Sequence, residues 1–135
     1  MTTETNHLPV VRDRLISVDP PALLGGRCHA CLGLSFPVES YCPFCGTRDP
    51  EPVQLASAGT VYSFTIARFP PPGYIGEVPF GLGIVELPDG IRVASTLLAE
   101  PLDSLHIGAT VRFRLLEIAT EDGPMLSYAY AMENP

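Results

Sequence analysis

Alternation of apolar and polar residues dominates the second half of the chain and predicts a mainly β protein. Residues 59–67 are rich in β-branched and aromatic types, and period two places Tyr62, Phe64 and Ile66 on one face and hydroxyl side chains on the other. Turns rich in Gly and Pro separate this stretch from further predicted strands at 80–87, 91–97, 110–116 and 124–132. Five strands with a helical turn in 101–107, after the third, predict a five-stranded, partly open barrel of the OB type.

Two details of these strands bear on the predicted barrel. Val111, Phe113 and Leu115 are expected to face inward. Gly81 and Gly83 interrupt the second strand, which indicates sharp coiling or close approach of two backbones.

The first third of the chain reads differently. Apolar residues between Val10 and Val18 suit one face of a short helix that ends before Pro20, or an extended arm. A short strand is expected between Leu34 and Pro37. We therefore predict three parts: an N-terminal arm at 1–22, a small module at 23–50 and the barrel at 51–135.

All four cysteines lie in the small module, as two pairs with two residues between the members of each pair. They are Cys28, Cys31, Cys42 and Cys45. Turns of this kind direct two sulfurs at one ion, so two of them supply a tetrahedral site for a structural zinc ion. Gly46 follows the second pair, where the chain is expected to need an unusual φ angle.

Two other interpretations of the cysteines stay open. Paired disulfides suit small secreted proteins, but the first 20 residues show no secretory signal. A rubredoxin-like iron site uses the same four thiolates, and Cys-Pro-Phe-Cys-Gly is typical of such a knuckle. We favour one structural Zn²⁺ in a rubredoxin-like zinc ribbon. The ion replaces the core that a ribbon of roughly 25 residues is too small to bury.

Composition narrows the choice of partners. The net charge is −7, and all eight basic residues are arginines without a dense cluster. Nucleic acid is bound mainly through clustered Lys and Arg, so the composition argues against it as a partner. The sequence contains no run of 18 apolar residues, so it predicts no membrane-spanning helix. Thiolate ligands without an export signal favour the cytoplasm.

Several short motifs together resemble a known family, the zinc-ribbon/OB-fold proteins filed as domain of unknown function thirty-five. The motifs are Leu24-Gly25-Gly26-Arg27-Cys28, Phe36-Pro37, Cys42-Pro43-x-Cys45-Gly46, 59–65, Val85-Glu86-Leu87-x-Asp89-Gly90 and Ile107-Gly108. The resemblance covers residues from about 20 to 132. It implies a non-catalytic accessory subunit, part of a hetero-oligomer with a thiolase-like, retro-aldolase or hydratase enzyme that acts on acyl-CoA thioesters. The N-terminal part is too short for the long helical hairpin of many relatives.

The residues themselves agree with a non-catalytic role. Acyl transfer needs an activated nucleophile with a positioned base. The cysteines are assigned to metal, no catalytic motif is present, and His106 is the one candidate acid or base, more simply read as a packed or surface residue.

The long loop between the first two barrel strands, 68–79, is the candidate contact region. Its prolines hold apolar side chains out, which suits docking on a partner; folding over the barrel's own open end is the alternative. Arg68 and Arg92 would meet CoA phosphates if they flank a shared channel, and are otherwise ordinary solvated arginines. The candidate partner or acyl-CoA channel residues are Arg68, Phe69, Pro71, Tyr74, Ile75 and Arg92.

Two functions of other classes stay open. A ribbon with an OB barrel can bind single-stranded nucleic acid through a basic groove and stacking aromatics. A rubredoxin-like electron carrier would hold iron in place of zinc.

Overall fold

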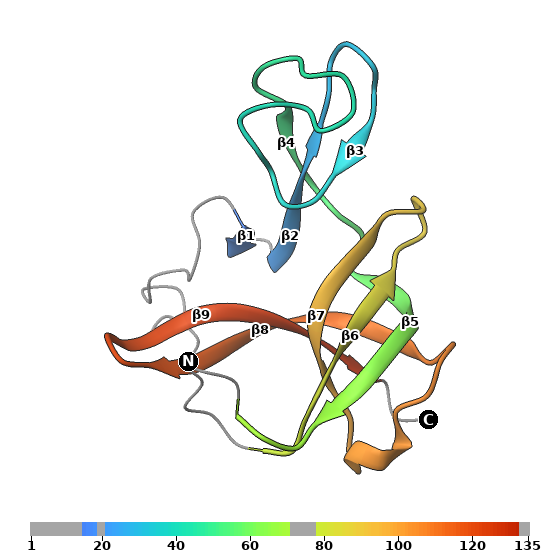
Figure 1. The fold of residues 1–135 in the computed structure, drawn as a ribbon, viewed down its shortest axis with the longest axis vertical. Helices are drawn as coiled ribbons and strands as arrows, with labels where there is room; N and C mark the ends of the chain where they lie inside the picture. Colours follow the sequence, from blue (N-terminus) through green and yellow to red (C-terminus); the bar gives the residue numbers. More distant parts are fainter. Residues whose placement is uncertain (1–14, 19–20, 71–77, 133–135) are drawn as a thin grey trace.

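A computed structural model describes residues 15–18, 21–70 and 78–132. In these ranges the chain forms a small four-stranded sheet and a closed five-stranded barrel (Figure 1). The small sheet consists of β1 (Ile16–Val18), β2 (Pro21–Arg27), β3 (Leu34–Ser35) and β4 (Glu51–Gln54). The barrel consists of β5 (Ala58–Ala67), β6 (Phe80–Glu86), β7 (Arg92–Leu98), β8 (Thr110–Thr120) and β9 (Gly123–Met132), with a 3₁₀ turn, η1 (Leu102–Ser104), after β7. The prediction of a ribbon followed by an OB-type barrel is confirmed.

Strand β2 organises the small sheet, because it pairs antiparallel with β1, β3 and β4. The segment 16–18 is extended and pairs with β2, so the helix interpretation is wrong for these residues; 10–14 lie outside the described ranges. An extended partner satisfies the backbone groups of β2, which a helix does not do. Strand β4 begins at residue 51, the predicted start of the barrel module, and pairs with β2.

The barrel closes in the order β5-β6-β7-β9-β8, and is therefore closed where a partly open one was expected. Closure depends on β9, which pairs antiparallel with β8 and parallel with β7 through Thr96 and Ala129. The predicted helical turn is present as η1. Within the described ranges, no helix has the length and hydropathy needed to cross a membrane.

The predicted inward alternation holds along β8, where Val111 is fully buried and its neighbour on the outer face is exposed. The predicted close approach at the β6 glycines is also confirmed. A Cβ on Gly83 would lie 2.2 Å from the carbonyl oxygen of Ser63. Only glycine therefore allows β5 and β6 to pair here without displacement of the backbone.

The prediction for Tyr62 is wrong. Phe64 and Ile66 pack against the core, but Tyr62 is 47% exposed and the adjacent Val61 is buried. The register shifts between Val61 and Ser63 opposite β6, and this irregularity puts the alternation out of step at Tyr62.

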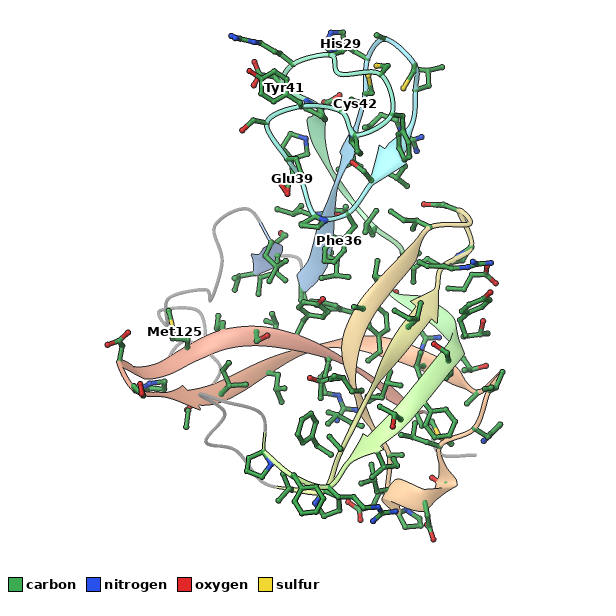
Figure 2. The ribbon with its side chains drawn as sticks, in the orientation of Figure 1. His29, Phe36, Glu39, Tyr41, Cys42 and Met125 are labelled. Carbon is green, nitrogen blue, oxygen red and sulfur yellow. The ribbon has the colours of Figure 1, made fainter. Side chains whose placement is uncertain are left out.

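The ribbon and the barrel share one hydrophobic cluster. Leu23 of β2 is fully buried in the same cluster as Val85 of the barrel. At the junction, the ring of Phe36 meets the ring of Tyr128 edge-on, with a centroid separation of 6.2 Å. Figure 2 shows Phe36 at the barrel side of the ribbon and Cys42 at its far end. The base of the ribbon is therefore held by packing, and its tip lies away from that core.

Candidate metal centre

Two turns with the same hydrogen bonds present the four cysteines. In the first, the N–H of Cys28 donates to the carbonyl of Gly33 at 2.9 Å, and the N–H of Leu32 donates to the carbonyl of Cys28 at 3.0 Å. In the second, the N–H of Cys42 donates to the carbonyl of Thr47 at 2.8 Å, and the N–H of Gly46 donates back to Cys42 at 2.9 Å. Each turn folds so that both of its sulfurs face the other turn.

The two turns differ at one residue. Gly46 has φ +80°, as predicted from its place after the second cysteine pair. The equivalent residue of the first turn is Leu32, with φ +64°, a left-handed conformation that costs a non-glycine residue about 1–2 kcal/mol. The guanidinium of Arg27 donates to the carbonyl of Leu32 at 2.8 Å and supports the turn. Aligning Cys-x-x-Cys-Leu with Cys-x-x-Cys-Gly would have revealed this position in the sequence.

The sulfur atoms form a compact cluster. All four Sγ atoms lie within 4.8 Å of one another, and two contacts cross between the turns: Cys28 to Cys45 and Cys31 to Cys42, each 3.6 Å. A disulfide requires about 2.05 Å, and all four cysteines are free, so the disulfide interpretation is wrong for this structure. A tetrahedron with metal–sulfur bonds of about 2.3 Å has edges of about 3.8 Å, which these separations fit. The residues present therefore suit one four-thiolate metal ion.

Backbone N–H groups surround the sulfurs and favour their charged form. Cys28 Sγ accepts from the N–H groups of Cys31 and Ala30 at 3.4 and 3.3 Å. The first of these bonds is the main reason that the pKa of Cys28 falls to about 6, although desolvation opposes it. The Gly33 N–H lowers the pKa of Cys31, but desolvation and the three other thiols outweigh it and raise this pKa to about 11. Without a metal, the thiol of Cys28 therefore loses its proton at a lower pH than the thiol of Cys31 does.

Thr47 is a further contributor that the sequence reasoning missed. Its hydroxyl lies 3.1 Å from Cys45 Sγ, and this contact is the main cause of the lowered pKa of Cys45. The sequence did carry a signal for this contact, namely a hydroxyl residue two positions after the last cysteine. Thr47 therefore does for the exposed Cys45 what backbone N–H groups do for the buried Cys28.

The centre has a buried side and an exposed side. Cys28 and Cys42 are buried, whereas Cys31 and Cys45 face solvent. His29 is exposed and does not belong to the sulfur cluster. Four thiolates complete a tetrahedral shell, so this ligand set leaves no position at which a substrate could bind an ion.

The structure describes three of the six predicted contact residues, and these three lie at two separate places. Arg68 and Phe69 follow β5, with Phe69 85% exposed, while Pro71, Tyr74 and Ile75 lie outside the described residues. Arg92 begins β7 and is ion-paired with Glu86 at 3.2 Å. Residue 67 pairs with residue 80 and Glu86 pairs with Arg92, so the two arginines lie at opposite ends of β6, about 20 Å apart.

Sequence reasoning did not anticipate the neighbour of Arg92. Its guanidinium carbon lies 3.8 Å from the ring centroid of Tyr62, a cation–π contact that the irregular register of β5 makes possible. Nothing in the pattern of the sequence signals that register shift.

His106 lies on the surface of the barrel. Its Nδ1 is 2.9 Å from the carbonyl oxygen of Ser104, two residues away, so it bonds to backbone and not to a nucleophile. The expectation that His106 is a surface residue is confirmed.

Known proteins resemble the chain in both its sequence and its fold. A family model described as the C-terminal OB-fold domain of ChsH2 matches residues 52–116. A DUF35 domain-containing scaffold protein of Pyrococcus furiosus is 34% identical over 110 residues, which covers 80% of this chain and 79% of that protein. The chain belongs to the DUF35 family.

Other relatives carry the names of enzyme subunits. A benzoylsuccinyl-CoA thiolase subunit BbsA of Geobacter metallireducens is 31% identical and covers 82% of this chain and 74% of the relative. A probable enoyl-CoA hydratase alpha subunit of Thermomonospora curvata is 38% identical over 96 residues, 70% of this chain, but the match spans only 30% of that longer protein. A solved Ltp2-ChsH2(DUF35) aldolase structure matches with a TM-score of 0.67 and 33% identity, covering 82% of this chain and 84% of that one.

Proposed function

We propose that this DUF35 chain is a non-catalytic accessory subunit of an enzyme of thiolase, retro-aldolase or hydratase type that acts on acyl-CoA thioesters. The carrying observation is the cysteine cluster: its four thiolates face one another and complete a ligand shell. A metal held this way orders the protein and offers no open position for chemistry. A subunit with such a centre contributes structure, and the catalytic groups come from its partner.

Relatives from several enzymes support this assignment. One is named as a subunit of a thiolase, another as a subunit of a probable hydratase, and the structural match is an aldolase with a DUF35 component. The names of the thiolase and the hydratase both specify CoA compounds, although the reactions differ. A common accessory role accounts for one small fold that occurs with different reactions.

We assign the metal as a single structural Zn²⁺ held by Cys28, Cys31, Cys42 and Cys45. Thiolates bind both zinc and iron, and the short ribbon favours zinc as the ion that replaces a hydrophobic core. The N–H groups and Thr47 stabilise the charged sulfurs. When bound, zinc supplies folding free energy to the tip of the ribbon.

We assign a CoA contact to Arg68 and not to a pair of arginines. Arg92 already stacks on Tyr62 and bonds to Glu86, while Arg68 is exposed at the end of β5. The separation along β6 is too large for both side chains to hold one diphosphate. In this proposal Arg68 binds a CoA phosphate at the end of β5, beside Phe69. The partner subunit supplies the rest of that site.

Purification from the native host tests the proposal. A tagged chain is expected to co-purify with a thiolase-type, aldolase-type or hydratase-type protein, identified by mass spectrometry, whose activity on its thioester falls when this chain is removed. The isolated chain is expected to carry one zinc ion and no thioester activity. A stable lone chain without effect on such an enzyme, or turnover by the chain alone, would contradict the proposal.

A further inference from the structure

The four sulfurs of the metal centre are not equally open to reagents in solution. Cys28 and Cys42 are 1% and 4% exposed, whereas Cys31 and Cys45 face solvent, so each turn supplies one sulfur of each kind. All four sulfurs are thiolates when they hold an ion, and they then differ in access and nucleophilicity and not in protonation. A reagent that oxidises thiolates therefore meets Cys31 or Cys45 first.

Hydrogen bonding separates these two exposed sulfurs. Cys45 Sγ lies 3.1 Å from the hydroxyl of Thr47, which donates to it when the sulfur is a thiolate. Apart from the other sulfurs, the described residues give Cys31 Sγ one hydrogen bond, from the N–H of Gly33 at 3.4 Å. A donor withdraws electron density from a thiolate, and nucleophilicity falls with basicity, about threefold for a tenfold change. Cys31 is therefore the more reactive of the two.

A second sulfur lies within reach of an oxidised Cys31. Cys42 Sγ is 3.6 Å from Cys31 Sγ, and a disulfide needs about 2.05 Å, so the two atoms must approach by about 1.5 Å. The two residues belong to different turns. A bond between them would join the turns directly, in place of the ion that otherwise holds them together.

We propose that Cys31 is a site of oxidation by hydrogen peroxide, and that it goes on to form a disulfide with Cys42. In the first step the Cys31 thiolate attacks a peroxide oxygen, a sulfenic acid forms on Cys31, and hydroxide leaves. In the second step the Cys42 thiolate attacks the sulfenic sulfur, the S–S bond forms, and a second hydroxide leaves. The two sulfurs lose two electrons in total, and the peroxide gains them.

The consequence is local to the tip of the ribbon. The disulfide leaves an ion with two of its four thiolate ligands, so the ion is released and residues 28–49 lose the order that it provides. The tip lies at the far end of the ribbon from the barrel, which stays folded (Figure 2). This inference rests on the zinc ion assigned under the proposed function, and does not depend on the identity of the partner enzyme.

Peptide mapping of the zinc-loaded full chain tests the order of reaction. The chain is treated with hydrogen peroxide in the presence of dimedone, which traps sulfenic acids, and cleavage after Glu39 separates the two cysteine pairs for mass spectrometry. Dimedone is expected on Cys31 about threefold more than on Cys45. Without dimedone, a Cys31–Cys42 disulfide is expected to form first. A chromophoric chelator should detect one zinc ion released for each such disulfide.

Two substitutions of Thr47 form a matched pair. Thr47→Val keeps nearly the same shape but removes the hydroxyl, so labelling of Cys45 is expected to rise about threefold and approach that of Cys31. Thr47→Ser retains a hydroxyl and is expected to keep the wild-type ratio of labels. Zinc content and thermal unfolding before treatment report whether each variant is folded and loaded.

Each outcome decides the inference. Equal labelling of Cys31 and Cys45 in the wild-type chain, a first disulfide that lacks Cys31, or zinc that stays bound after the disulfide forms would overturn it and leave the zinc assignment standing. A wild-type chain that binds no zinc would overturn both. If Thr47→Val does not take up zinc, the ratio of labels in the wild-type chain decides alone.

Discussion

The tip of the ribbon and the barrel are stabilised by different means, although one chain forms both. Between residues 28 and 49 the buried side chains are Val38 and two of the ligand cysteines. Every strand of the barrel contributes at least one buried valine or leucine to a common cluster. Its stability therefore follows from apolar burial, while the tip depends on an ion.

The base of the ribbon belongs with the barrel in this respect. Leu23 and Leu55 lie in the barrel's hydrophobic cluster, and Phe36 contacts Tyr128. The boundary between the part that is stabilised by apolar packing and the part that depends on the ion therefore lies inside the ribbon, between Phe36 and the cysteines. Substitutions on either side of that boundary separate the two contributions.

Loss of the metal is expected to have the largest effect. Cys42→Ser removes one ligand, and in zinc-finger peptides metal binding contributes about 10–16 kcal/mol, so residues 28–49 should unfold while the barrel persists. Amide hydrogen exchange, read separately for the tip and for the barrel, measures this. Ser40→Ala, at an exposed position beside the site, is the control. Equal loss of protection in both regions would mean that the chain is one cooperative unit.

Within the barrel, Gly83→Ala is expected to cost about 3 kcal/mol. The new Cβ would lie 2.2 Å from a backbone oxygen of β5, so paired strands must separate. Gly90→Ala is the control, since Gly90 has φ +86° but no atom within 4 Å of a Cβ, and about 1 kcal/mol is expected. Urea unfolding gives both values, and a smaller loss for Gly83→Ala than for Gly90→Ala would be inconsistent with the close strand approach.

At the junction, Phe36→Ala is expected to cost about 2 kcal/mol, because the ring is partly buried and pairs edge-on with Tyr128. Phe44→Ala, at a side chain 65% exposed on the tip, should cost less than about 0.5 kcal/mol. The comparison uses urea unfolding of the zinc-loaded chain. Similar costs for the two substitutions would show that the ribbon base is not part of the common core.

The smallest effects are expected on zinc affinity, from one substitution in each of the two cysteine turns. Leu32→Gly relieves a left-handed leucine that is 67% exposed, and should tighten zinc binding about threefold after the extra flexibility of glycine is allowed for. Gly46→Ala introduces the same strain into the second turn and should weaken binding about tenfold. Competition with a chromophoric chelator measures both. Changes in the same direction would argue against equivalent turns.

Much of this architecture can be predicted from local patterns. Strand positions follow from period two, the cysteine cluster from two short spacings, and the left-handed Gly46 from its place after a pair. Each of these depends on residues within a few positions of one another. The same locality explains why Gly83 could be recognised as a point of close approach, although the contacted atom could not be named.

The missed features depend on residues far apart in the sequence or on a local exception. Parallel pairing of Thr96 with Ala129 closes the barrel across a long separation. Tyr62 turns outward because the register shifts by one residue, which period two does not reveal. Segment 16–18 is extended because β2 offers it a free edge, although its apolar spacing suits either conformation.

The position of β9 has a consequence for synthesis of the protein. Within the described residues, this strand lies between β7 and β8 and closes the barrel, and it follows both of them along the chain. On the ribosome, the barrel therefore stays incomplete until β9 has emerged, whereas the cysteine turns are already exposed and able to take up their ion. Metal loading can thus precede closure of the barrel, and the nascent chain carries an ordered tip before it has a finished core.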